Sequence, residues 1–333
     1  MKLKRTVYLG YYLKQLNRQK FWHFLNYAAK QSGRSKAILI ADAVQSVFRY
    51  NISLLEYFQF KFYELKSRER EDWAGTGFMY EHQLRMNPPG ARNILENKIS
   101  FYKKYKDFFI HQLADINDLK NDALLAFSML SNPTGKLVFK TAEGNCGTKV
   151  DMRSCEVFDR EGLIKFLEYS EYDLVEECIE QHPALNRLSP SAVNTVRVIT
   201  EIKDDGKVEI LGCRLRISIN LSVDNMAAGN IAASIDEESG KINGPAVYSD
   251  ITNEQKKYHP ITGERIIGFQ IPFWERTLEM VKKAAGLYSG NRSIGWDIVI
   301  TKSGPGLIEG NHDWCKLLWQ LPVEKGLKGM LID

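Results

Sequence analysis

The sequence has no apolar run of the roughly 18 residues that a membrane-spanning helix requires. Its apolar stretches at residues 37–41 and 123–127 are much shorter. The first residues are basic, but charged side chains return before the apolar core of a signal peptide could form. We therefore expect a protein that does not span a bilayer and that stays in the cytoplasm.

Several motifs of familiar chemistry are also missing. The five cysteines are odd in number and include no CxxC pair, which predicts reduced thiols rather than a disulfide framework. The six histidines show no HxxxH or Cys/His spacing, so zinc chemistry is not indicated. A GxSxG nucleophile elbow, the HRD and DFG motifs of kinases, and a Walker A loop are absent as well. Covalent catalysis by the protein is therefore not expected.

Positive charge is concentrated at the start of the chain. Residues 1–72 contain 14 Lys and Arg against 6 Asp and Glu, whereas the remainder contains 31 against 35. The same region is rich in aromatic residues, and such a surface could contact an anionic membrane peripherally. The aromatics recur at helical spacings, however, which favours a helical region that uses them as its core. No nucleic-acid partner is predicted, and the oligomeric state does not follow from the sequence.

The chain changes character twice. Residues 1–85 have the periodicity of helices, including a predicted helix over 53–73, and a break follows at residues 87–90. A further helix is predicted over 93–109. After Pro133, short β-type segments alternate with helices, which predicts an α+β core of mainly antiparallel sheets.

A β-hairpin at residues 295–314 carries three oxygen-bearing side chains, Asp297, Glu309 and Asn311. With Gly304 at the centre of the turn, Asp297 lies opposite Asn311 and all three side chains project from one face. A slip of two residues in the pairing preserves this arrangement, whereas a slip of one destroys it. Such a set of oxygen ligands suits magnesium in a nucleotide-phosphate enzyme. An ordinary hairpin with polar ends is the alternative.

A second candidate site is the glycine-containing loop at residues 141–148, which follows a predicted strand at 136–140. Gly144 and Gly147 allow the backbone to approach an anion, and Lys140 at the strand end supplies a positive charge. This arrangement can close over phosphates. A plain hairpin turn would have a similar sequence.

A third candidate is the predicted strand at residues 172–179, which ends in the adjacent acids Glu176 and Glu177. Its backbone could bind an adenine, with carboxylates near the amino group or the ribose. Solvated acids at the end of a strand are the alternative.

Arginines on later strands form the fourth candidate. Arg197 lies on one predicted strand, and Arg214 and Arg216 share a face of the next. Guanidinium groups suit a phosphate or a carboxylate. Cross-strand pairing with Glu201 or Glu209 is equally compatible with the pattern.

Taken in chain order, these motifs resemble those of the ATP-grasp superfamily. The sequence of the motifs is similar to that of the sugar-transfer-associated branch and of teichuronopeptide-type relatives. The resemblance rests on the segments SAVNTVRVIT, CRLRISI, VDNMAAGNIAASID, HPITGERIIGFQIPFWERTLEMV and GWDIVITKSGPGLIEGNHDW. The similarity covers residues 50–322. It implies an ATP-grasp fold, in which two α+β subdomains enclose ATP between antiparallel sheets. The expected regions are a helical region at 1–88, a subdomain with the phosphate loop at 89–175, and a subdomain with the metal site at 176–333.

The resemblance also implies roles for individual residues. Lys140 would contact the α- and β-phosphates, and Lys98 would be a second phosphate-binding lysine. Arg214 and Arg197 would face the transferred phosphoryl group or the acceptor. The loop residues expected to close over the phosphates are Gly144, Asn145 and Gly147. Those expected to line the adenine are Glu176, Glu177 and Ile179. Those expected to hold one or two Mg²⁺ ions are Asp297, Glu309 as the bridge, and Asn311.

The activity that the resemblance implies is an ADP-forming ligase, which joins a carboxylate to an amine through an acyl phosphate in exopolysaccharide, capsule or other cell-surface glycan biosynthesis. A kinase acting on a sugar or other small-molecule hydroxyl, and a non-catalytic nucleotide-binding regulator, are the alternatives. The acceptor is not identified. The sequence departs from the expected pattern at Gly229–Asn230 and at residues 312–314, where we expect the acceptor to bind.

Overall fold

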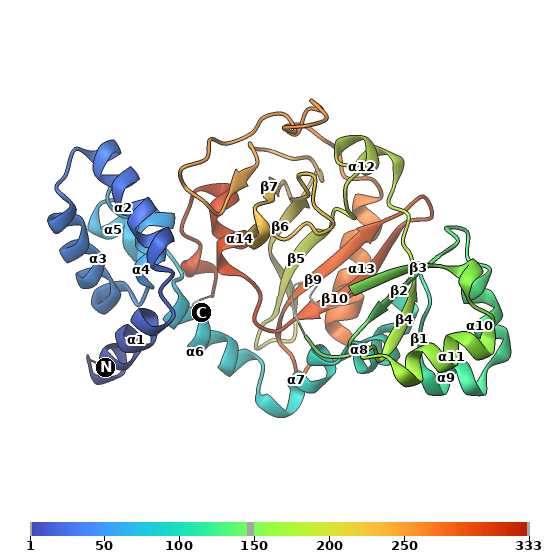
Figure 1. The fold of residues 1–333 in the computed structure, drawn as a ribbon. Helices are drawn as coiled ribbons and strands as arrows, with labels where there is room; N and C mark the ends of the chain where they lie inside the picture. Colours follow the sequence, from blue (N-terminus) through green and yellow to red (C-terminus); the bar gives the residue numbers. More distant parts are fainter. Residues whose placement is uncertain (1, 145–149, 332–333) are drawn as a thin grey trace.

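The structure is a computed structural model that describes residues 2–144 and 150–331. Figure 1 shows a lobe of N-terminal helices beside two antiparallel sheets. The helices are α1 (Lys2–Lys14), α2 (Arg18–Ser32), α3 (Lys36–Tyr50), α4 (Leu54–Gln59), α5 (Ser67–Glu71), α6 (Thr76–Met86), α7 (Pro89–Glu96), α8 (Lys98–Tyr105), α9 (Ile116–Asn121), α10 (Ala123–Leu130), α11 (Arg160–Tyr169), α12 (Pro183–Leu188), α13 (Trp274–Leu287) and α14 (Lys316–Gln320). In the described part of the chain, none of them has both the length and the apolar character that a bilayer span requires.

The strands form two sheets. They are β1 (Leu113–Asp115), β2 (Lys136–Lys140), β3 (Val150–Ser154), β4 (Leu174–Glu177), β5 (Val196–Ile202), β6 (Val208–Ile217), β7 (Ile231–Ile235), β8 (Val247–Tyr248), β9 (Ser293–Ile300) and β10 (Pro305–Asn311). The first sheet has the order β1-β4-β2-β3, and the second has the order β10-β9-β5-β6-β7-β8. Every pairing is antiparallel, so the predicted α+β class with antiparallel sheets is confirmed.

Side chains alternate along a strand, so each sheet packs one face against helices and turns the charged side chains of the site to its other face. In the four-stranded sheet, Leu137 and Phe139 pack with residues of α10 and α11, which turns Lys140 to the opposite side. In the six-stranded sheet, Trp296 and Ile298 pack with α13, which turns Asp297 to the opposite side. The faces that carry Lys140 and Asp297 therefore contribute to one site.

The helical lobe uses its aromatic residues as a core, as the spacing favoured. The predicted helix over 53–73 is wrong in its middle: α4 ends at Gln59, Lys61 has a φ of 52°, and α5 begins only at Ser67. The physical reason is the aromatic run between them, whose side chains are at most 2% exposed. Residues two apart lie on different sides of a helix, so one helix cannot bury them all. The run comprises Phe58, Phe60, Phe62 and Tyr63.

The predicted helix over 93–109 is also interrupted. It divides into α7 and α8 at Asn97, whose side chain accepts a hydrogen bond from Ser100 N at 3.0 Å and so caps α8. Lys98 then stands at the start of α8, where its N–H donates to Ala142 O at 2.9 Å. The hydrogen bond from Lys98 to Ala142 thus joins the start of α8 to the segment that follows β2.

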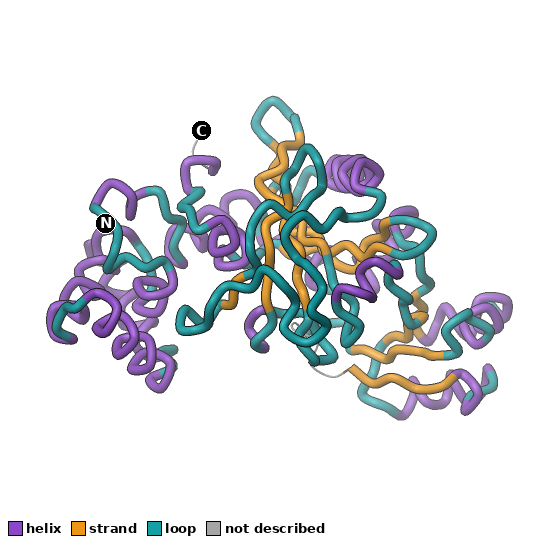
Figure 2. The backbone as a smooth tube through the Cα atoms, turned by 90° about the horizontal axis from the view of Figure 1, so that it is seen from above, coloured by secondary structure: helices purple, strands orange, loops and turns teal. Residues whose placement is uncertain are grey.

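The helical lobe is joined to the end of the chain. Figure 2 shows the lobe beside the sheets, with the C-terminus near it. Glu56 of α4 is 2% exposed and pairs with Lys316 of α14 at 3.0 Å. Gln320 of α14 exchanges hydrogen bonds with both backbone groups of Ala74. These buried polar contacts set the position of the lobe, because an unpaired partner would be costly.

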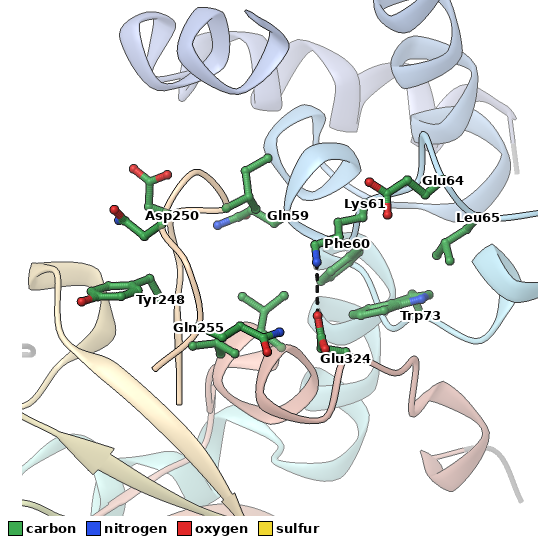
Figure 3. A pocket seen from close by; sticks show the side chains of 14 residues that line it. Gln59, Phe60, Lys61, Glu64, Leu65, Trp73, Tyr248, Asp250, Gln255 and Glu324 are labelled. Carbon is green, nitrogen blue, oxygen red and sulfur yellow. Dashed lines mark hydrogen bonds and ion pairs between the residues drawn. The ribbon is translucent and has the colours of Figure 1, made fainter. Parts of the chain in front are cut away.

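A cavity of about 280 Å³ lies at this junction. Figure 3 shows Lys61 and Glu324 meeting across it in an ion pair of 3.2 Å. Both residues have a positive φ, 52° for Lys61 and 49° for Glu324. Non-glycine residues rarely adopt this conformation. The junction therefore holds two residues in an unfavourable backbone region.

We expect Lys61→Gly to be more stable than Lys61→Val by about 1–2 kcal/mol, because a β-branched side chain is disfavoured at positive φ. Both substitutions remove the same exposed ion pair, so their difference isolates the backbone. Urea denaturation measures it. A valine variant as stable as the glycine variant would contradict the assigned backbone conformation.

Candidate functional site

A cleft of about 300 Å³ lies between the two sheets. Its lining includes the polar or charged residues Lys98, Lys140, Thr141, Glu176, Glu177, Thr195, Arg216, Asp224, Asn225, Asp297 and Glu309. Val138, Met152 and Ile179 add apolar surface. Residues that are distant in the sequence therefore meet at one place, with lysines on one wall and a carboxylate pair on the other.

Lys140 and Glu176 form the centre of the first wall. Lys140 Nζ lies 2.5 Å from Glu176 Oε2, and His111 Nε2 lies 3.8 Å from the same oxygen. Burial alone would raise the pKa of Glu176, but the charge of Lys140 and the nearby His111 outweigh it and lower the pKa to about 2. Glu176 is therefore a carboxylate near neutral pH.

Lys98 lies beside them. Its Nζ donates to Gly144 O at 2.9 Å, and burial lowers its pKa although Glu309 acts in the opposite direction. Lys98 and Lys140 thus bring two ammonium groups to the loop that the sequence assigned to phosphate. Gly144 lines the cleft, while the other two predicted loop residues, Asn145 and Gly147, lie outside the described residues.

The predicted adenine-binding residues lie where β4 leaves the sheet. Glu177 and Ile179 line the cleft together with Cys178. β4 is an inner strand, and the Glu177 N–H donates to Gln112 O at 3.0 Å. A ligand there would approach the segment after the strand rather than an open strand edge.

The second wall is built around Asp297. Arg197 donates to both of its oxygens, from Nε at 2.5 Å and from Nη2 at 2.9 Å, and Arg216 Nη1 donates at 2.9 Å. Arg216 also reaches Asp224 Oδ1 at 2.6 Å, and Asp224 accepts from both N and Oγ1 of Thr195. A continuous ionic network therefore crosses β9, β5 and β6.

Arg216 and Asp224 are residues of this site that the sequence prediction did not select. Strand alternation placed Arg216 on the face of Arg214, and this was the available signal. Nothing in the local pattern around Asp224 distinguished it from a loop acid, because its partners come from other strands.

Arg214 is placed elsewhere. It is 3% exposed and absent from the residues that line the cleft, and its Nε donates to Trp319 O at 2.9 Å. Burial lowers its pKa to about 10. Helix α14 covers this part of the sheet, so the guanidinium satisfies a carbonyl at the end of that helix. The structure does not bring Arg214 to the position predicted for a phosphoryl-contacting group.

The hairpin pairing differs from the prediction by two residues. Asp297 pairs with Glu309 rather than with Asn311, which pairs with Gly295. At the turn end the register is shifted by one more residue, and a β-bulge at Ile308 absorbs the difference. Without the bulge, Glu309 would lie on the opposite face from Asp297. The bulge therefore assembles the carboxylate pair.

The predicted metal set fits a hard cation by its chemistry. Asp297 is a buried carboxylate and Glu309 a half-buried one, and Asn311 Nδ2 donates to Glu309 Oε1 at 3.2 Å. Desolvation raises the pKa of Glu309, and the charge of Asp297 raises it further, as expected for two crowded carboxylates. Among the described residues, no group of three His, Cys, Asp or Glu side chains is placed to hold a metal ion, so in the predicted set the amide of Asn311 would add a third protein oxygen.

The two places where the sequence departs from the expected pattern have different roles. Asn230 is fully buried and braces a loop, since its side chain accepts from Ile219 N and donates to Val223 O and Asn225 O. Trp314 is 2% exposed and packs on Trp319. Neither side chain is placed to bind an acceptor.

His312 and Asp313 line a second cavity of about 390 Å³. It borders the first cleft at Gly144, and His312 Nε2 lies 3.0 Å from Glu96 Oε1. Of the predicted acceptor segment, these two residues remain open to a ligand.

Two antiparallel sheets face each other across a cleft, with Lys140 on one, Lys98 of α8 beside it, and a carboxylate pair on the other, and this arrangement is that of an ATP-grasp protein. The family model "sugar-transfer associated ATP-grasp" matches residues 78–333. The chain belongs to this family.

Several solved structures are similar to part of this chain, at low sequence identity and low TM-score. N5-carboxyaminoimidazole synthetase from Staphylococcus aureus is 8% identical, with a TM-score of 0.40 over 70% of this chain and 52% of that one. D-alanyl-alanine synthetase A from Vibrio cholerae is 13% identical, with a TM-score of 0.39 over 74% and 68%. Biotin carboxylase from Campylobacter jejuni is 12% identical, with a TM-score of 0.41 over 69% and 43%. The chain spans about half the length of the first relatives. A sequence search of curated proteins gives no match.

We expect Lys140→Met to lower the free energy of unfolding by about 3 kcal/mol at pH 7, because it leaves the buried Glu176 charge without its closest cation. The folded-state pKa of Glu176 lies below its ordinary value of 4.5. The pair therefore stabilises the fold above that pH, and its contribution is lost as the pH falls toward 2.

Denaturant unfolding of both proteins between pH 3 and pH 7 measures this difference. Lys136→Met, at the exposed other end of β2, is the matched control and should show no such pH dependence. An equal loss from Lys140→Met at pH 3 and pH 7 would argue against the buried ion pair.

Proposed function

We propose that the protein is an ATP- and magnesium-dependent, ADP-forming ligase that joins a carboxylate to an amine through an acyl phosphate. The observation that carries the proposal is the arrangement of the cleft, where Lys98 and Lys140 face the Asp297–Glu309 pair across about 300 Å³. Membership of the sugar-transfer-associated family supports an acceptor in exopolysaccharide, capsule or cell-surface glycan biosynthesis.

The first step is phosphoryl transfer. An acceptor carboxylate oxygen attacks the γ-phosphorus, the bond to the β–γ bridging oxygen breaks, and ADP leaves. Catalysis of this step requires positioning and charge neutralisation rather than a protein nucleophile. Lys140 and Lys98 would bind phosphate oxygens from one side. Magnesium held by Asp297, Glu309 and Asn311 would neutralise phosphate charge from the other.

The second step is amide formation. The amine nitrogen attacks the acyl carbon, inorganic phosphate leaves, and the nitrogen releases a proton. Arg197 and Arg216 are already engaged with Asp297, so they would act by holding that carboxylate in its orientation. This role differs from the direct phosphoryl contact that the sequence suggested for Arg197 and Arg214.

Mass spectrometry of reactions with Mg-ATP and pools of amino acids, uronic acids and sugar nucleotides tests the activity. A ligase would release ADP and phosphate together with a condensed product. A stable phosphorylated product without free phosphate would instead identify a kinase. Nucleotide binding without any new product would favour the non-catalytic regulator.

Glu309→Gln should lower kcat by at least about 100-fold, since it removes one of the carboxylates that would hold magnesium beside the transferred phosphoryl group. Glu279→Gln, an exposed acid on α13, is the control and should retain full activity. Unchanged turnover of Glu309→Gln would remove the carboxylate pair from the proposed mechanism.

We further propose that the basic N-terminal helices contact anionic membranes peripherally. Val7 and Tyr11 of α1 and Trp22 of α2 remain more than half exposed, and residues 1–72 carry excess positive charge. The protein should sediment with vesicles of phosphatidylcholine and phosphatidylserine, and 0.5 M salt should release most of it. Pure phosphatidylcholine vesicles are the control. Failure to bind anionic vesicles at low salt would end this proposal.

A further inference from the structure

His111 is a buried histidine without an ordinary hydrogen-bond partner. Its side chain is 5% exposed, and neither ring nitrogen forms a hydrogen bond within the described residues. The nearest acceptor is Glu176 Oε2, which is 3.8 Å from His111 Nε2. Buried polar groups are nearly always hydrogen-bonded, so an exception requires an explanation.

Glu176 forms an ion pair with Lys140. Its Oε2 accepts from Lys140 Nζ at 2.5 Å, and the residue is 6% exposed. Lys140 is also the residue proposed to bind nucleotide phosphate. If its ammonium turns to a phosphate, a buried carboxylate loses its closest positive charge, which is unfavourable unless another cation replaces it.

The remaining ionisable groups around His111 are already satisfied or exposed. Glu177 Oε2 accepts from Gln112 N at 2.8 Å. Glu180 and Lys302 pair with each other at 3.3 Å, with side chains 66% and 64% exposed. Cys178 lines the cavity beside His111 with these residues. Glu176 is therefore the buried acid closest to the imidazole.

We propose that His111 is a positioning residue that holds Glu176 when Lys140 turns to the nucleotide phosphate, so that nucleotide binding is coupled to the uptake of one proton. The neutral imidazole takes this proton from the solvent, and the resulting imidazolium donates to Glu176. No covalent bond forms or breaks. The inference rests on the proposed function, because it requires a nucleotide in this cleft.

The coupling has a definite sign. If binding takes up a proton, the nucleotide Kd rises with pH, by up to tenfold per pH unit for one proton.

Isothermal titration calorimetry with magnesium and the β,γ-imido analogue of ATP measures the nucleotide Kd and the proton uptake on binding. Titrations between pH 7.0 and 8.5, in two buffers of different ionisation enthalpy, give the Kd and the number of protons taken up. The wild type should take up close to one more proton than His111→Gln. Subtracting the two proteins cancels the titration of the nucleotide itself.

Two further variants serve as controls. His111→Phe keeps an aromatic ring at this position but removes both ring nitrogens, and should also lack the extra proton uptake. His23→Gln makes the chemical change of His111→Gln at a histidine of α2 whose Nε2 contacts Thr252, and should behave as the wild type.

The outcomes separate this inference from the proposed function. Nucleotide binding by the wild type with the same proton uptake as His111→Gln would overturn the role of His111 and leave the proposed function standing. No nucleotide binding by the folded wild type would overturn both. A Kd that rises with pH only when His111 is present would support both.

Discussion

The placement of Asp297 is the constraint on which the second wall of the cleft depends. A buried carboxylate is unfavourable unless it is paired and hydrogen-bonded, and Asp297 receives three hydrogen bonds from Arg197 and Arg216. Through Arg216 the network continues to Asp224, which fixes the loop after β6. The candidate metal site and the loop after β6 are thus parts of one electrostatic unit.

The first wall also depends on a buried carboxylate, Glu176, that is paired with a cation. Glu176 pairs with Lys140, which is also the lysine proposed to bind phosphate, so the charge balance around Glu176 would change if a phosphate drew Lys140 away. The arginines on Asp297 lie within an ionic network of their own. The charge of Asp297 is therefore compensated inside the protein, whereas the proposed function would require Glu176 to change partners.

The sequence predicted those features that depend on local pattern. Alternation along β9 and β10 predicted Asp297 and Glu309 on one face, and order along the chain indicated the fold. The pairing partner of Asp297 was wrong by two residues, because the turn is not centred on Gly304: Pro305 already pairs with Ile300, which displaces the pairing by three residues, and the bulge at Ile308 recovers one of them. The two carboxylates share a face only because of this bulge, which has no local sequence signature. The break at Lys61 was missed because helical periodicity does not reveal that several consecutive aromatics must all be buried.

By itself, the sequence determined the class of fold and the chemistry of the cleft, since strand alternation and the types of side chain are properties of short segments. Only the tertiary structure decided which groups meet. Arg214 and Arg216 share a strand face, yet α14 covers Arg214 and leaves Arg216 at the cleft. His111 and Glu176 are brought together by the pairing of β1 with β4. Such contacts join distant segments, so no local pattern could specify them.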